Sequence, residues 1–451
     1  MNAQAQHRSP RRLRAGLLTT CLGLVIAGSA HADAVTDWNG IFDAASPAVG
    51  GPPQAAYLGA MVHIAIHDAL NSIDPRYRTY SVVPTASMSA SPNAAIAAAA
   101  RDVLINQLNR PPESPAKAAA RASVEASYLA ALAAIPNGTA ENQGIAAGQA
   151  AAAAIIALRL NDGSDTPNLP YTLAPGPGVY QPTAPNFPAP ANAGFALIRP
   201  FALRSASQFR AEPGDLFQLK GIAYALNYNL VKTLGEFNTR VSRPDSRETD
   251  IARFWPSGGA NWSLVARTIV ANRHLDRWQH ARLFALMQIA AIDGAISVFE
   301  TKYTYNFWRP VTAIRWANDG NPFTKPDADW LPFFSFIGPW STPPYPDYTC
   351  GLSTISGANT EVLRRYFRTD HVPYTLKVTA PALALAPPPA APVLPAKDIT
   401  RSYWSLSHAA EESARSRVYA GIHFYEGCLQ GVHQGEQVGR YVFGHYLKPV
   451  Q

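Results

Sequence analysis

This chain has few charged residues and few segments with a strand-like pattern. Only 15% of its 451 residues are charged, against 47% that are hydrophobic. This composition excludes a disordered protein and allows one large core or two smaller ones. Few segments show the two-residue alternation of a half-buried strand. We therefore expect a mostly α-helical protein of one or two domains.

A general excess of positive charge is also missing. The formal net charge is +7, but four of the 38 basic residues and none of the 31 acidic ones lie in residues 1–32, so the remainder carries only +3. Nothing in this balance suggests a nucleic acid partner. The four basic residues are Arg8, Arg11, Arg12 and Arg14.

These arginines precede a short apolar run, AGLLTTCLGLVIAGSA, and small residues at positions 30–32. This layout predicts a secretory signal peptide cleaved after Ala32, and the arginine pair at 11–12 leaves both Sec and twin-arginine export open. We expect an exported protein, periplasmic or secreted. No later segment looks long and apolar enough to span a membrane, because the alanine-rich run near residue 150 is interrupted by Gln149 and Arg159. The oligomeric state does not follow from the sequence.

Apolar residues recur at helical spacing along most of the chain. The predicted helices cover residues 52–73, 93–108, 114–134, 141–160, 213–234, 261–271 and 276–301. Residues 161–213 are crowded with Pro, Gly and Asn, which predicts an irregular excursion over the surface. The Pro- and Ala-rich residues 379–397 predict a surface loop before a last helical region at 398–446. We expect two stacked helical bundles, an N-terminal one at residues 33–235 and a C-terminal one at 236–451.

Two segments of the C-terminal half place basic residues at helix ends. In KYTYNFWRP, Lys302 and Arg309 are about two helical turns apart, and Pro310 disfavours helix at the arginine. In SRVYAGIH, Arg417 and His423 are on different faces of a straight helix. Gly421 lies between them and can bend the chain to bring them together.

A third segment, PPYPDYTCGLSTISGANTEVL, has the layout of a helix N-terminus with free backbone N–H groups. Gly351 at this point lets a ligand come close to the backbone. Two arginines and a lysine around such an end suit a tetrahedral oxyanion, because guanidinium groups pair with its oxygens and the lysine adds a point charge. A nearby histidine supplies a nucleophile or a metal ligand.

In this order and at these separations, the segments resemble those of the vanadium-dependent haloperoxidases and of the type 2 phosphatidic acid phosphatase superfamily that includes them. The similarity is closest to the bacterial secreted haloperoxidase-like branch and covers nearly the whole mature chain. It implies an all-α fold of two stacked helical bundles with long Pro-rich loops. The segments that carry it are DAVTDWN, AMVHIAIHDALNSIDPRY, KYTYNFWRPVTAIR, TPPYPDY and SRVYAGIHF.

The resemblance also implies the roles of the site residues. Lys302, Arg309 and Arg417 would bind the equatorial oxygens of vanadate, or of phosphate in the same site, with help from the N–H of Gly351. His423 would be the axial ligand of vanadium, and hydrogen peroxide would oxidise a halide or an organic acceptor. In a phosphatase the same imidazole would attack phosphorus.

The chain departs from this family at the turn itself. Where the family shows Pro-Ser-Gly-His, residues 349–352 read Thr-Cys-Gly-Leu. Cys350 puts a thiol among the oxyanion-binding groups, and Leu352 replaces the acid/base histidine, whose work is typically worth about 10² to 10⁴ in rate. We expect an impaired vanadium haloperoxidase-like peroxidase. The alternatives are an acid phosphatase with a His423 nucleophile and a catalytically silent oxyanion-binding protein.

Supporting roles stay open at this stage. Glu426, shortly after His423, either orients the imidazole or is a solvated helix charge. Asp293, on the helix that leads to Lys302, is either a further partner of the site or part of an exposed stripe. The candidates for a replacement acid are Tyr348, Asp347 and His408.

Cys350 and Cys428 are the cysteines that remain after the leader is removed. If Cys350 flanks the oxyanion and His423 lies beneath it, as the resemblance implies, the segments of the two cysteines approach one another. In an oxidising compartment nearby thiols tend to pair, and a bridge would stabilise the fold by roughly 4 kcal/mol in the chain-entropy model. The alternative is two separate buried thiols.

Overall fold

The computed structural model describes residues 33–450 apart from residues 169, 185–186, 256–260, 335–341 and 385–392. The predicted signal peptide lies outside the described residues. Residues 33–451 form one compact unit, and the boundary expected between residues 235 and 236 stays a prediction.

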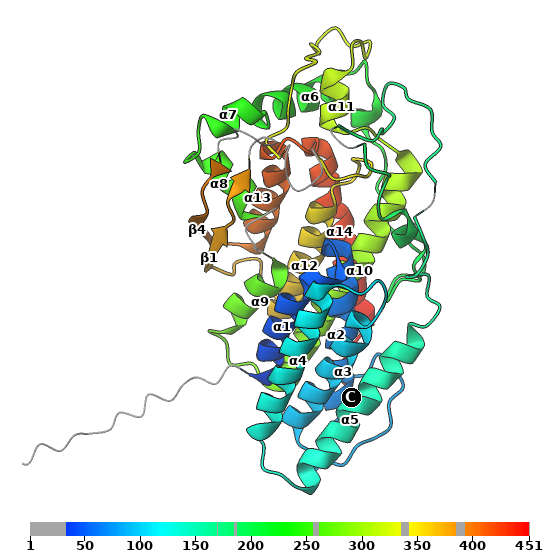
Figure 1. Ribbon diagram of the computed structural model, residues 1–451, viewed down its shortest axis with the longest axis vertical. Helices are drawn as coiled ribbons and strands as arrows, with labels where there is room; N and C mark the ends of the chain where they lie inside the picture. The colour runs from blue at the N-terminus through cyan, green and yellow to red at the C-terminus, as the bar shows by residue number, and fades with distance from the viewer. Residues whose placement is uncertain are drawn as a thin grey trace, which may run out of the picture. The chain divides into compact units, whose positions relative to one another are not determined.

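Helices make up most of the described residues, as expected (Figure 1). The α-helices are α1 (Ala34–Ala45), α2 (Pro52–Ile73), α3 (Pro92–Leu108), α4 (Pro115–Ala133), α5 (Thr139–Leu158), α6 (Ile222–Leu234), α7 (Phe237–Val241), α8 (Arg247–Phe254), α9 (Trp262–Val270), α10 (Arg277–Tyr305), α11 (Pro310–Arg315), α12 (Gly351–Phe367), α13 (Leu406–Tyr419) and α14 (Tyr425–His445). Three short 3-10 helices lie at Ser46–Val49, Ala193–Leu197 and Asp215–Phe217.

Helices α1 to α5 form the N-terminal bundle. Helices α2, α3 and α5 pack against one another, and α4 packs on α3 and α1. Local chemistry sets where two of these helices begin, because the side chains of Ser91 and Ser114 accept the N–H groups of Ala94 and Lys117. The alanine-rich faces are buried and let the helices approach closely. The four helices predicted between residues 52 and 160 are present within two residues of their expected bounds.

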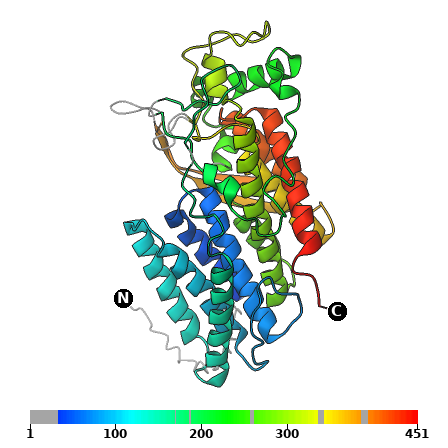
Figure 2. The same ribbon diagram turned by 90° about the vertical axis from the view of Figure 1, so that its right-hand side faces the viewer.

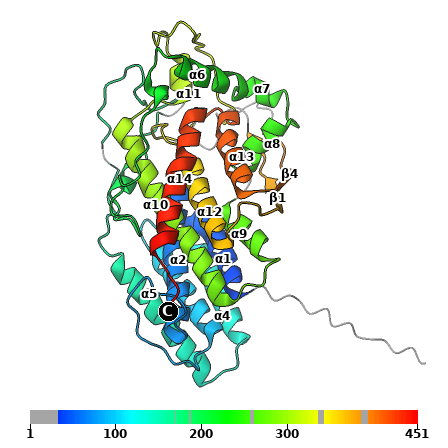
Figure 3. The same cartoon turned by 180° about the vertical axis from the view of Figure 1, so that it is seen from behind.

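Helix α10 is the core element on which both groups of helices pack. It contacts α2 on the N-terminal side and α12 and α14 on the C-terminal side (Figure 3). It begins at a capping box formed by Asp276 and Gln279. By length and composition α10 could cross a membrane, so the expectation that no such segment follows the leader was wrong. Its most apolar stretch is 94% buried inside the protein, as in the core helix of a globular fold.

The C-terminal bundle consists of α10, α12, α13 and α14. Helix α12 contacts the other three, and α13 also packs on α8. In Figure 2, α14 runs alongside α10. These contacts place the last turn of α10, the first turn of α12 and the turn between α13 and α14 at the same end of the bundle.

Two short antiparallel sheets correct the sequence analysis. Strand β1 (Tyr374–Ala380) pairs with β4 (Lys397–Tyr403), and β2 (Leu383–Ala384) pairs with β3 (Val393–Leu394). Residues 379–397 therefore do not form only a surface loop, and helix does not resume until Leu406. The physical reason is visible in β1, where every second side chain is buried and a paired strand satisfies the backbone groups.

The excursion at residues 161–213 is mostly irregular, as predicted, but part of it is buried. Asp293 of α10, fully buried, accepts the backbone N–H groups of Phe201, Ala202 and Leu203 at 2.6, 2.7 and 2.8 Å. Burial raises the pKa of Asp293 to about 6, although these hydrogen bonds oppose the rise. Asp293 is thus an anchor that holds this loop on α10.

Helices α12 and α14 meet backbone to backbone. Gly431, Gly435 and Gly439 recur every fourth residue on the face of α14 that packs on α12. A Cβ atom at Gly435 would clash with the carbonyl oxygen of Thr354, and one at Gly439 with that of Ala358. Because no side chain separates the helices there, the position of the α12 N-terminus is set by backbone contact.

We expect Gly435→Ala to lower the free energy of unfolding by about 1–3 kcal/mol, because the added methyl group must push α12 away from α14. Denaturant unfolding followed by circular dichroism measures this change. The matched control is Gly444→Ala on the same helix, where a Cβ would meet nothing within 4 Å, and which should be neutral or slightly stabilising. Equal effects of the two substitutions would contradict the backbone contact.

Candidate active site

Lys302 and Arg309 are both fully buried at the end of α10. The Lys302 Nζ donates to the carbonyl oxygens of Pro346 and Asp347 at 2.9 and 2.7 Å. Arg309 is the residue before α11, with Pro310 as the first helical position, so the expected helix-end placement is confirmed. Its Nε and Nη1 donate to the carbonyl oxygens of Tyr345 and Ile422 at 2.7 and 2.8 Å. Main-chain carbonyls thus orient both cations.

Burial, and then the charge of Arg309, lower the pKa of Lys302 to about 7. The amino group is therefore close to half-charged near neutral pH. An anion that binds beside it would favour the charged form.

The turn between α13 and α14 brings Arg417 and His423 together. Arg417 lies in the last turn of α13, and Gly421, with φ of +78°, redirects the chain before His423. A Cβ at Gly421 would also lie 2.7 Å from the Cβ of Pro332, so this position requires glycine on two counts. The bend predicted at Gly421 is confirmed.

His423 is buried between an acid and a base. Its Nδ1 lies 2.8 Å from Oδ1 of Asp347, close enough for an ion pair although not aligned as a hydrogen bond. Its Nε2 lies 3.1 Å from Nη1 of Arg309. A guanidinium only donates, so Nε2 must present its lone pair there and the proton belongs on Nδ1, toward Asp347. His423 is therefore held in the tautomer whose Nε2 can act as a nucleophile or a metal ligand.

The N-terminus of α12 faces this histidine. Cys350 precedes the helix, and its side chain makes no capping hydrogen bond, which leaves the first N–H groups of the helix free for a ligand. A Cβ at Gly351 would approach only Val298, at 4.0 Å, so there is room beside the backbone. Leu352 is half-buried and packs on the side chains around Cys350.

Two buried guanidinium N–H groups at this site have no partner among the described residues. They are Nη2 of Arg309 and Nε of Arg417, whose side chains are 0% and 9% exposed. Buried donors normally find an acceptor. Three cationic side chains, those of Lys302, Arg309 and Arg417, lie with the single carboxylate of Asp347, so the local charge suits an anion. The residues present fit a tetrahedral oxyanion such as vanadate or phosphate.

Cys350 and Cys428 meet, as the resemblance implied, but the expected disulfide is absent from the structure. Both are free, fully buried thiols that pack with Ala414. The S–H of Cys428 donates to the Cys350 sulfur, which satisfies the pair without a covalent bond. Burial raises the pKa of Cys428, whereas the pKa of Cys350 is held low by that hydrogen bond and by His423 and Arg417 against its own burial.

The structure does not bring three other candidates to the site. Glu426 lies beside Gly214, with its Oε1 3.5 Å from where a Cβ of that glycine would be. The Tyr348 hydroxyl donates to the carbonyl oxygen of Glu212. His408 stacks on Trp404 with ring centroids 3.5 Å apart. Of the residues considered for the missing acid, Asp347 lies in the site, where it contacts His423.

Gln434 is a supporting residue that the sequence analysis missed. This buried side chain accepts from the Thr349 hydroxyl at 2.6 Å and donates to the hydroxyls of Thr301 and Ser297 at 2.9 and 3.0 Å. It ties the turn before α12 to α10, directly beside Lys302. A Gln at the tenth position of a helix that also holds Gln430 and Gln437 carries no local signal, because its partners come from two distant segments.

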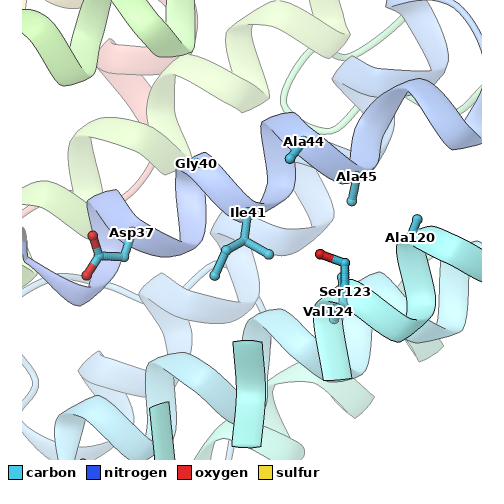
Figure 4. A pocket seen from close by; sticks show the side chains of 8 residues that line it. All are labelled: Asp37, Gly40, Ile41, Ala44, Ala45, Ala120, Ser123 and Val124. Carbon is cyan, nitrogen blue, oxygen red and sulfur yellow. The ribbon is translucent and has the colours of Figure 1, made fainter. Parts of the chain in front are cut away.

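A surface hollow of about 400 Å³ lies elsewhere, between α1 and α4 (Figure 4). It holds none of the predicted site residues. Its lining residues are Asp37, Gly40, Ile41, Ala44, Ala45, Ala120, Ser123 and Val124. Among the described residues, no group of three His, Cys, Asp or Glu side chains is placed to hold a metal ion.

Residues 282–451 match the family model described as VCPO second helical-bundle domain, a range that contains every cationic residue of the site. The chain is 25% identical over 476 residues to the vanadium chloroperoxidase of Curvularia inaequalis, covering 83% of this chain and 74% of the relative. The chain is thus similar in sequence to the vanadium haloperoxidases.

Solved structures agree in fold. A bacterial vanadium-dependent iodoperoxidase superposes with a TM-score of 0.70 at 22% identity, covering 92% of this chain and 98% of that one. A holo-type bacterial vanadium-dependent chloroperoxidase gives 0.65 at 19% identity, over 88% and 93%. The haloperoxidase fold of two helical bundles predicted from the sequence is confirmed.

We expect sulfate binding to weaken as the pH rises from about 6 to about 8, because Lys302 loses its charge near pH 7. Sulfate keeps its own charge over this range, so the change reports the protein. Loss of one favourable charge contact should lower the association constant by about tenfold, measured by calorimetry. In Lys302→Met the slope should disappear; a slope that persists there would assign the titration to another group.

We expect Asp347→Asn to weaken vanadate binding by about 10–100-fold, because the imidazole loses the carboxylate that fixes its tautomer. Glu426→Gln is the matched control and should leave the affinity unchanged. Calorimetry on both variants shows which of the two carboxylates supports vanadate binding, and unfolding curves confirm that each variant is folded. The reverse pattern would mean that Glu426 orients His423 in solution.

Proposed function

We propose that this protein is an exported, vanadate-dependent peroxidase of the haloperoxidase type that uses hydrogen peroxide to oxidise a halide or an organic acceptor. We further propose that the loss of an acid/base histidine at Leu352 impairs its turnover. The observation that carries the proposal is the pair of unpartnered, buried guanidinium N–H groups on Arg309 and Arg417, next to an imidazole whose Nε2 presents its lone pair to Nη1 of Arg309.

Each residue has a distinct task in this proposal. Lys302, Arg309 and Arg417 neutralise the oxyanion, and the N–H of Gly351 adds a backbone donor. His423 would hold the vanadium through Nε2, while Asp347 holds the proton on Nδ1. Bound vanadate would supply the centre at which peroxide is activated. Because Nη1 of Arg309 lies 3.1 Å from Nε2, that guanidinium must turn toward the anion when the ligand arrives.

The side chain at position 352 limits the chemistry. Leucine neither donates nor accepts a proton, and its partly buried side chain covers the place where the family carries its acid/base. Oxyanion binding does not need this group, because binding relies on cationic side chains and backbone donors. We therefore expect affinity to survive better than turnover.

An acid phosphatase is the second candidate function. The Asp347 carboxylate beside Nδ1 favours it, since it stabilises the positive charge that the imidazole gains when Nε2 attacks phosphorus. The lack of an acid/base side chain at Leu352 weighs against a phosphatase, because the leaving alcohol needs a proton.

The deciding experiment offers the purified mature chain vanadate, peroxide and bromide, then a thioether, and separately a phosphate ester. We expect vanadate-dependent oxidation well below an ordinary enzyme turnover of about 10 s⁻¹, and its loss in Arg417→Ala. Leu352→His should raise turnover by about 10²-fold, and affinity far less. Leu352→Asn, polar but not titratable in this range, is the matched control.

Other outcomes assign other functions. Ester hydrolysis without vanadate-dependent oxidation would establish the phosphatase, and oxyanion binding with neither activity would establish a binding protein. Bromination near 10 s⁻¹ by the unaltered chain would show that Leu352 does not impair it. Absence of any oxyanion binding at millimolar concentration would remove the proposal altogether.

A further inference from the structure

The two buried cysteines form a contacting pair at the wall of the candidate site. The backbone N–H of Cys350 donates to the carbonyl oxygen of Gly427 at 3.0 Å, which brings it next to Cys428 in the first turn of α14. Both side chains are 0% exposed and pack together with Ala414. The S–H of Cys428 donates to the Cys350 sulfur. Two thiols in contact can form a disulfide with little movement.

The surroundings of the two sulfurs differ. Cys350 interacts electrostatically with His423 and Arg417, the groups proposed to hold the oxyanion, and a Cβ at Gly351 beside it would approach only Val298, at 4.0 Å. Cys428 hydrogen-bonds to Cys350. A reagent bound among these groups therefore contacts Cys350 first. Cys428 lies next to Cys350 and can react with it afterwards.

We propose that Cys350 and Cys428 are a peroxide-reducing dithiol. The Cys350 sulfur attacks one oxygen of hydrogen peroxide, the O–O bond breaks, and the products are a sulfenic acid on Cys350 and one water. The Cys428 sulfur then attacks the Cys350 sulfur, the S–O bond breaks, and a second water leaves as the disulfide forms. Overall, two thiols and one peroxide give one disulfide and two waters.

Burial makes peroxide the fitting oxidant. Fully buried thiols are closed to bulky disulfides and alkylating reagents, whereas peroxide is only slightly larger than water. The inference rests on the proposed function only in taking peroxide as the reagent that enters this pocket. It needs no vanadate, because the sulfurs supply the electrons.

The test uses the full mature chain, reduced and freed of vanadate and phosphate, with one equivalent of hydrogen peroxide. The reaction is stopped by unfolding in a maleimide, and the intact mass gives the number of free thiols. We expect two labels before peroxide and none after it. In Cys428→Ser a sulfenic acid should form on Cys350 and be trapped there by dimedone once the chain is unfolded, and in Cys350→Ser peroxide consumption should fall by about tenfold or more.

Two labels retained after peroxide, or equal peroxide consumption by Cys350→Ser and the unaltered chain, would overturn the inference. A native-state maleimide reaction as fast as that with peroxide would also contradict it, since size selection would be lost. Circular dichroism confirms that each variant is folded. A chain that consumes peroxide through its thiols but shows no vanadate-dependent oxidation would refute the proposed function and leave this inference intact.

Discussion

The backbone contact between α12 and α14 is the constraint on which the site depends. Glycines on α14 remove every side chain that would hold the helices apart, so the first turn of α12 lies directly against the first turns of α14. His423 lies two residues before the first residue of α14, and Gly351 begins α12. The imidazole and the free N–H groups of the helix can therefore face one ligand, a geometry that looser packing would not hold to the required accuracy.

Burial of like charges is the second constraint, and it explains the function of the surrounding loops. Removing Lys302 and Arg309 from water is costly unless their protons are accepted elsewhere. Main-chain carbonyls of Tyr345, Pro346 and Ile422 accept three of them. The guanidinium N–H groups left without a described partner are those that an arriving oxyanion can satisfy. Part of the electrostatic stabilisation of these buried cations would therefore form only when the ligand binds.

The departures from the family motif lie within this preserved frame. In the proposed function, leucine at position 352 stands where the resembling family has a titratable group and leaves the backbone donors, so it would act on proton transfer more than on anion binding. Substitution at position 350 replaces a hydroxyl with an oxidisable sulfur next to a second sulfur. One site can therefore lose acid/base chemistry and gain thiol chemistry without any change in the packing that holds its cations.

Much of this architecture could be predicted from local pattern: the helices between residues 52 and 160, the helix end at Arg309 imposed by Pro310, and the bend at Gly421. The family resemblance identified Lys302, Arg309 and Arg417 as the cationic residues of the site. The sequence by itself determined these features because they depend on neighbours in the chain. Only the tertiary structure decided that Asp347, and not Glu426, contacts His423, and that Gln434 ties the turn before α12 to α10. It also decided that β1 pairs with β4 and that Asp293 anchors the loop at residues 201–203. Each of these depends on residues distant in sequence, whose proximity is set by packing.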